Sequence, residues 1–85
     1  MSTANTYAAE GTLAATTGTV EFPWPAREVQ IINDSTQFDL QFRFNPTETY
    51  LTVGPQEVVS MEDVRIVTLY INSAESVPYR IWGLG

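Results

Sequence analysis

Carboxylates and hydroxyls are the residue types in this chain that could perform acid–base or nucleophilic chemistry. Glu62 and Asp63 are adjacent between two expected strands, and Asp34 and Asp39 flank an expected loop. Paired carboxylates can serve glycoside hydrolysis or hold calcium. Adjacent acids in a turn are ordinarily just solvated, and turn formation alone accounts for Asp34. We therefore expect no catalytic residues and no metal ligands.

The residues that would activate a nucleophile are missing from the composition. The 85 residues include no histidine and no cysteine. Without histidine, the serines lack the usual general base; they stand at positions 2, 35, 60, 73 and 76. Glycine-rich phosphate loops are also absent. The sequence predicts a protein that is not an enzyme and uses no cofactor.

The charge balance narrows the class of partner. Ten acidic residues face four basic ones, all arginine, which gives a net charge of −6. Nucleic acids and anionic membranes are both recognised mainly through cationic side chains. The apolar runs are too short for a spanning helix, and residues 1–18 lack the segments of a secretory signal. We expect neither a nucleic acid nor a membrane as partner.

The small size points to a protein partner. In a chain this short, apolar burial and the entropy of ordering nearly cancel, so stability commonly depends on a disulfide, a metal or a partner. Without cysteine a disulfide is impossible, and without cysteine or histidine the usual zinc ligands are missing. A binding or assembly protein is the class that remains.

The first 18 residues differ from the rest in composition. Thirteen of them are Ala, Thr, Gly or Ser, and Tyr7 and Leu13 are the larger apolar residues. So few apolar groups cannot offset the entropy cost of ordering the segment by itself. We expect residues 1–18 to form an extended N-terminal arm. Such an arm is either a terminus without a role or a segment that orders against a neighbouring subunit.

From residue 19 onward, apolar and polar residues alternate with a period of two, which is typical of strands. The pattern predicts an all-β domain over residues 19–85, a small antiparallel β-sandwich of about seven strands, either jelly-roll or immunoglobulin-like. The Cys-Trp-Cys framework of a true immunoglobulin domain is absent. The expected strands are Thr19–Phe22, Arg27–Asn33, Asp39–Asn45, Thr49–Val53, Gln56–Met61, Arg65–Ile71 and Val77–Leu84.

Two tryptophans are candidate contact residues. Trp24 lies between two prolines, which fix an extended backbone, and Trp82 alternates away from the expected core side of its strand. With Tyr50 they would form either a protein-contact surface or a platform for sugar rings. A third interpretation is that they only cover the open ends of the sandwich.

Two arginines and one short motif complete the candidates. Arg43 and Arg80 fall on the polar faces of their strands, where they could pair with acids across the sheet or across subunits. Residues 33–35, Asn-Asp-Ser, fit the N-glycosylation pattern. Since we expect no secretion signal, we interpret this match as accidental.

The whole chain resembles the small accessory virion proteins of tailed bacteriophages, in particular head decoration (cement) proteins. The resemblance depends on the Ala/Thr-rich arm, the lysine-free acidic β-domain and the motifs Val29–Asn33, Leu40–Asn45 and Tyr79–Gly83. It implies binding to the capsid exterior, often as a homotrimer, with arms that reach across neighbouring capsomers. Tyr7 and Leu13 would then anchor the arm, and Trp24 and Trp82 would lie at subunit contacts.

Our leading hypothesis is a structural virion protein that binds the major capsid protein, or another virion protein, on the outside of the capsid and catalyses no reaction. The alternative is a monomeric module that binds a glycan or a host surface through Trp24, Tyr50 and Trp82. Deleting residues 1–18 should abolish binding only in the first case.

Overall fold

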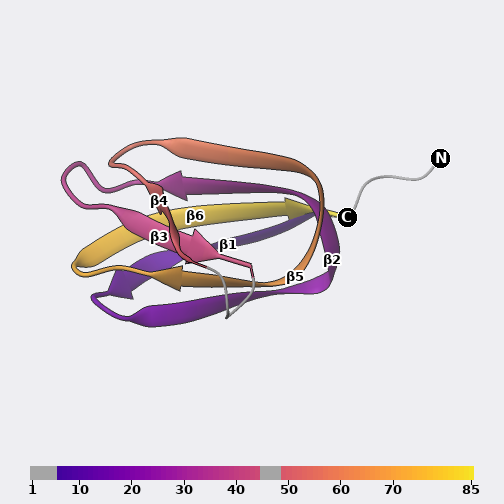
Figure 1. Cartoon of the computed structure of the whole chain (residues 1–85), viewed down its shortest axis with the longest axis horizontal. Helices are drawn as coiled ribbons and strands as arrows, with labels where there is room; N and C mark the ends of the chain where they lie inside the picture. Colours follow the sequence, from indigo (N-terminus) through magenta and orange to yellow (C-terminus); the bar gives the residue numbers. More distant parts are fainter. Residues whose placement is uncertain (1–5, 45–48) are drawn as a thin grey trace.

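A computed structural model describes residues 6–44 and 49–85 of the chain. These residues form six antiparallel strands and no helix, and therefore none that could span a membrane (Figure 1). The expected all-β, antiparallel class is confirmed. The strands form one sheet in the order β1-β6-β2-β5-β3-β4. Their bounds are β1 (Thr6–Ala14), β2 (Thr17–Asn33), β3 (Leu40–Arg43), β4 (Leu51–Val53), β5 (Val58–Asn72) and β6 (Ser76–Leu84).

The sheet curls over on itself because its two longest strands bend together. β2 has 17 residues and β5 has 15, and both turn at the same end of the molecule (Figure 1). Their pairing shifts register between Glu21 and Ala26, and again between Ala26 and Glu28. Pro23 and Pro25 lie in the first shift, where the ladder is interrupted and a missing backbone N–H is tolerated.

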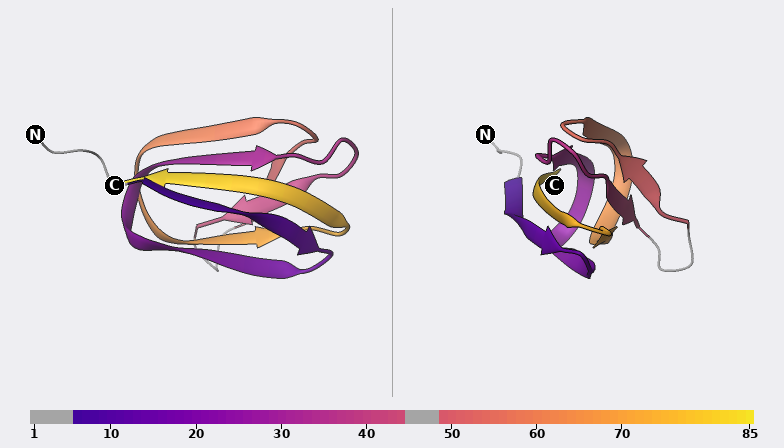
Figure 2. Two further views of the ribbon diagram at one scale, coloured as in Figure 1. Left: turned by 180° about the vertical axis from the view of Figure 1, so that it is seen from behind. Right: turned by 90° about the vertical axis from the view of Figure 1, so that its left-hand side faces the viewer.

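The bend divides the sheet into two facing layers (Figure 2). The first layer contains β1, β6, residues 28–33 of β2 and residues 58–62 of β5. The second layer contains residues 17–21 of β2, residues 68–72 of β5, β3 and β4. Each long strand therefore contributes one half to each layer.

The core fills the space between the two layers. It follows the period of two in the strands, so that alternate apolar side chains point inward. Within residues 6–44 and 49–85, three polar side chains are buried with it: Asn33, Ser35 and Ser73. The buried apolar residues are Leu13, Val20, Phe22, Ala26, Val29, Ile31, Leu40, Phe42, Val53, Ile66, Leu69, Ile71, Val77 and Ile81.

The strand count differs from the expected seven for a physical reason. The expected strands Thr19–Phe22 and Arg27–Asn33 are the two halves of β2, which continues through its prolines. In the same way, Gln56–Met61 and Arg65–Ile71 fall within the continuous β5, apart from residues 56 and 57. In the sequence the prolines predict a strand end, whereas in the structure they lie at a register shift in the bend of β2. Asn45, the expected end of another strand, and Ser2 lie outside the described residues.

The expected arm also differs from the structure, because most of it is a strand of the domain. β1 pairs with β6 from Thr6 opposite Leu84 to Ala14 opposite Ser76. Backbone hydrogen bonds to the edge of β6 can hold this segment although its side chains are small. Leu13, only 7% exposed, points into the core of its own chain. Residues 1–5 lie outside the described residues.

Candidate functional site

The outer side of the first layer carries Trp82, the most exposed aromatic residue among those that the structure describes. Trp82 is 44% exposed. In the cross-strand row that contains it, Ala8 lies opposite on β1 and Gln30 on β2, followed by Ser60 on β5. These neighbours are short or polar, so the indole stands above the sheet. We call this surface the Trp82 face; it comprises Ala8, Gln30, Ile32, Val58, Trp82 and Leu84.

A small pocket lies beside the indole. It has a volume of about 100 Å³ and is lined by Glu28, Gln30, Trp82 and Leu84. Pockets that enclose small-molecule ligands typically measure about 300–1,000 Å³. The pocket is therefore too small for a whole ligand, but it gives the apolar surface a carboxylate and an amide at one side. This arrangement suits a contact on a surface rather than an enclosed binding site.

Arg80 lies on the same strand and side as Trp82. Its Nε donates a hydrogen bond to Oδ2 of Asp34 at 2.8 Å, and its Nη2 donates one to Oδ1 at 2.9 Å. The hydrogen bond from Arg80 lowers the pKa of the Asp34 carboxyl, and the same contact raises the pKa of Arg80. Arg80 thus pairs with an acid of its own chain, and this ion pair ties the residue after β2 to β6.

Arg43 lies on the opposite layer. Its guanidinium stacks over the ring of Tyr50, with 4.4 Å between Cζ and the ring centroid, and lies 5.8 Å from the ring centroid of Tyr70. The structure therefore does not bring Arg43 or Tyr50 to the surface that carries Trp82. An aromatic platform that combines Tyr50 with Trp82 is not formed within one chain.

Trp24 belongs to an aromatic cluster at the bend. Its ring stacks on Phe22 with centroids 6.5 Å apart, and Tyr7 meets Phe22 edge-on at 5.8 Å. A Cβ on Gly83 would lie 2.5 Å from the Phe22 ring, so only glycine fits there. Tyr7 and Trp24 are both half-buried and pack against the core. Their contacts match the interpretation that such residues cover an end of the sandwich.

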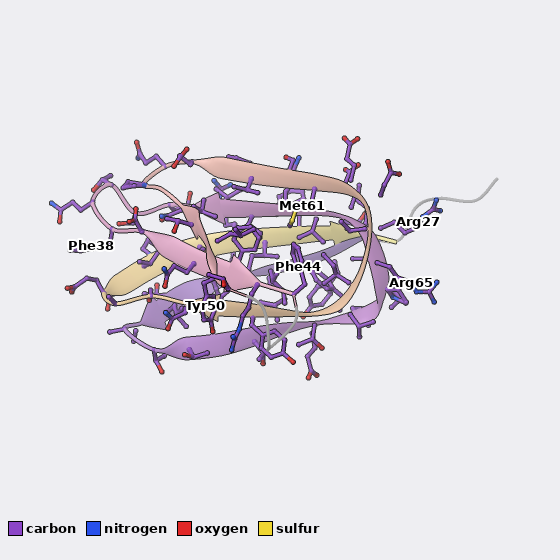
Figure 3. All side chains as sticks on the ribbon, in the orientation of Figure 1. Arg27, Phe38, Phe44, Tyr50, Met61 and Arg65 are labelled. Atoms are coloured by element: carbon purple, nitrogen blue, oxygen red, sulfur yellow. The ribbon has the colours of Figure 1, made fainter. Side chains whose placement is uncertain are left out.

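The acidic candidates do not form a site. Glu62 lies opposite Glu28 on the neighbouring strand, and Asp63 occupies the bend with a φ of 57°. Within residues 6–44 and 49–85, no group of three or more His, Cys, Asp or Glu residues could hold a metal ion. A wider hollow of about 310 Å³ lies among the loops near Phe38, at the end away from the bend (Figure 3). It is lined by Gln37, Phe38, Asp39, Gln41, Ser73, Ala74 and Glu75.

Asn33 is a residue whose role the sequence reasoning missed. Its side chain is fully buried, and Nδ2 donates hydrogen bonds to the carbonyl oxygens of Phe38 and Val53. Its Oδ1 accepts one from the backbone N–H of Ser35. In the folded chain this amide is enclosed and fully bonded, so it offers no site for glycosylation. The period of two could have predicted the burial of Asn33, since Asn33 follows Val29 and Ile31 on the inward side of the strand.

No family model matches the chain, and no curated protein matches it. Solved structures do share its fold. A de novo designed double-stranded β-helix, determined by solution NMR, matches with a TM-score of 0.62 at 15% identity over 93% of this chain and 99% of that one. A cupin-2 domain protein from Shewanella frigidimarina matches with a TM-score of 0.53 at 15% identity over 94% and 67%.

A cupin superfamily protein from Desulfitobacterium hafniense matches with a TM-score of 0.52 at 9% identity over 93% of this chain and 61% of that one. The chain thus spans about two thirds of the length of the two cupin proteins. Likenesses at such low identity show the fold alone. The fold is a curled antiparallel β-sheet of the double-stranded β-helix type.

Proposed function

We propose that the chain is a non-enzymatic structural protein that binds the outer surface of a viral particle through the Trp82 face. The supporting observation is the exposure of Trp82, at 44%, on a side of the sheet that also exposes Val58 at 55%. Tryptophan is enriched among the residues that dominate binding energy at protein interfaces. Exposed apolar patches that are rimmed by polar residues mark interaction sites on other proteins.

The position of Trp82 in the sheet supports a role in docking. β6 lies between β1 and β2 and is hydrogen-bonded to both, so its backbone is fixed before any partner arrives. A preorganised surface loses little conformational entropy on binding. Even a weak contact of this kind becomes a large stabilisation when it is repeated over a lattice.

The charge of the chain indicates the kind of partner surface. The net charge is −6, and Glu28 borders the pocket beside the indole. Complementary charge increases the rate of docking and selects among partners. We therefore propose a virion protein, the major capsid protein first, whose contact area carries an apolar pocket edged by basic side chains.

The second candidate is a module that binds a glycan. The observation in its favour is the pocket where the Trp82 indole lies beside the Glu28 carboxylate and the Gln30 amide. Jelly rolls serve as viral capsid domains and as lectins, so the fold does not separate the two candidates. In the glycan case Trp82 would act without Tyr50, which is occupied with Arg43 on the other layer.

The test uses particles of the phage that carries the gene, purified from cells with the gene intact and from cells with the gene deleted. The wild-type chain should be present on intact particles and should rebind to the deletion particles in a density gradient. Trp82→Ala should bind at least tenfold more weakly. Phe38→Ala is the matched control, because Phe38 is exposed to a similar degree, at 39%, among the loops.

Three results would contradict the proposal: absence of the chain from intact particles, equal binding by both variants, or equal loss by both. A glycan array read by tryptophan fluorescence tests the alternative. A sugar that quenches the wild-type signal, with the quench lost in Trp82→Ala, would establish the glycan module instead.

A further inference from the structure

Among the described residues, no strand pairs with the outer edge of β1. It is the terminal strand, bonded to β6 on one side, and it lies along the outside of the molecule (Figure 2). Its nine residues, TYAAEGTLA, include neither proline nor lysine and only one charge, Glu10. Natural proteins commonly protect such edges with short strands, prolines or charges, because an open edge is a template for another strand. β1 has almost none of these protections.

The other edges in the described part of the chain are shorter or more acidic. β4 at the far end of the sheet has three residues. In the first layer, the opposite edge is the first half of β5, which is bracketed by Glu57 and Glu62. In the second layer, the edge formed by residues 17–21 carries Glu21. Because each copy has a net charge of −6, two copies would repel each other least at β1.

We propose that β1 pairs antiparallel with β1 of a second copy around a two-fold axis, which joins the two first layers into one continuous sheet. The residues of this edge favour a second copy of the chain as the partner. Ala8, Ala9 and Gly11 allow close approach of two identical strands, and the charge of Glu10 lies opposite Arg80 on β6. An isologous contact requires such a self-complementary surface.

The position of Glu10 restricts the register of the pair. Full overlap of the two strands would place Glu10 opposite Glu10 of the second copy, and facing like charges are destabilising. A displacement by two residues keeps every side chain on its own face. The two-fold axis then passes through Ala9 or through Gly11. In the first register Ala8 faces Glu10 of the second copy, and in the second register Thr12 faces it.

The pairing places both Trp82 faces on the same side of the continuous sheet, because the two-fold axis is perpendicular to it. The assembly is a dimer, in place of the trimer that the resemblance to cement proteins implies. This inference is independent of the proposed function, since a dimer forms in solution without any particle. If the chain fails to bind particles, the dimer inference is therefore not affected. If the chain is a monomer in solution, the proposed binding to particles is not affected.

The test is sedimentation equilibrium of the full chain over a dilution series. The expected mass is twice 9.5 kDa. Ala8→Glu places two pairs of facing acids in the first register, and Thr12→Glu does so in the second. Whichever register the dimer adopts, the matching variant should weaken the dimer about tenfold or more. Thr19→Glu, at an exposed position of another edge, is the matched control and should leave the dimer intact.

Amide hydrogen exchange of the wild-type chain gives a second readout that needs no substitution. Protection of residues 6–14 should rise with protein concentration, whereas protection of β3 should not. A wild-type chain that is monomeric or trimeric throughout, a dimer that resists both β1 substitutions, or β1 protection that ignores concentration would each overturn the inference. Circular dichroism of each variant confirms that its fold is retained.

Discussion

Asn33→Ala should destabilise the domain more than any other change to a single polar side chain described above. The amide of Asn33 is fully buried and joins three backbone groups: the carbonyls of Phe38 and Val53 and the N–H of Ser35. Alanine would remove all three bonds and leave a small cavity. The groups that lose their partners would stay in place, because β4 and the turn after β2 are held by other contacts.

The size of the effect follows from which of these groups water can reach. The bonds to Val53 and Ser35 are buried, and the bond to Phe38 is partly buried. A buried polar group without a partner costs about 1–3 kcal/mol, whereas the Phe38 carbonyl can regain a bond to water. We expect a loss of about 4 kcal/mol. A chain of this length has a free energy of unfolding of roughly 4–13 kcal/mol in total.

Urea unfolding followed by circular dichroism measures this loss. With an m value of about 1–1.5 kcal/mol/M, the midpoint should fall by about 3 M urea without a change in slope. Asn72→Ala is the matched control. The amide of Asn72 bonds to Thr17 and Gln41 at the surface of the second layer, so its loss should cost about 1 kcal/mol or less. If the two variants differ by under about 1 kcal/mol, the reasoning from burial is refuted.

Two further changes test the bend and the surface ion pair. Gly83→Ala should cost about 1–3 kcal/mol in thermal or urea unfolding, since its Cβ would lie 2.5 Å from the Phe22 ring. Gly11→Ala, where the nearest atom would be 3.4 Å away, should be much milder, and equal costs would contradict this packing argument. In an NMR titration, the pKa of Asp34 should lie below its ordinary 3.8 and should rise in Arg80→Met, which removes the hydrogen bond that lowers it. Because folding lowers this pKa, the ion pair stabilises the fold above pH 3.8, and this stabilisation is lost as the pH falls through the lower pKa of the folded state. If the titration midpoint of Asp34 is the same in Arg80→Met as in the wild type, the assignment is refuted.

The fold could be predicted from the sequence as far as local pattern determines it. Alternation in Asp39–Asn45 and Val77–Leu84 located β3 and β6, because a strand with one buried face shows a period of two. The Ala/Thr-rich segment of β1 has no such pattern. It is a strand because the edge of β6 accepts its backbone, and this contact between residues about 70 positions apart leaves no local signal.

The candidate site was predictable only in part. Period two correctly placed Trp82 on the outer side of its strand, and Arg80 with it. The same rule could not show that Arg43 and Tyr50 lie on the opposite layer, because the layer of each strand is set by the bend in β2 and β5. The sequence predicts Tyr7 and Leu13 as contacts for a partner, whereas Leu13 is buried in the core of its own chain and Tyr7 packs against that core. Whether Trp82 binds a partner stays a prediction.

The pairing of Thr6 with Leu84 has a consequence for how the domain is made in the cell. β1 is synthesised first of the six described strands, and β6, the strand that it pairs with, is synthesised last. The pairing of β2 with β5 is also distant along the chain, from Thr17 opposite Asn72 to Ile32 opposite Val58. The domain therefore cannot complete its sheet until the residues of β6 have left the ribosome. Until then, the apolar sides of β2 and β5 are only partly covered, so the domain can complete its fold only after β6 has been synthesised.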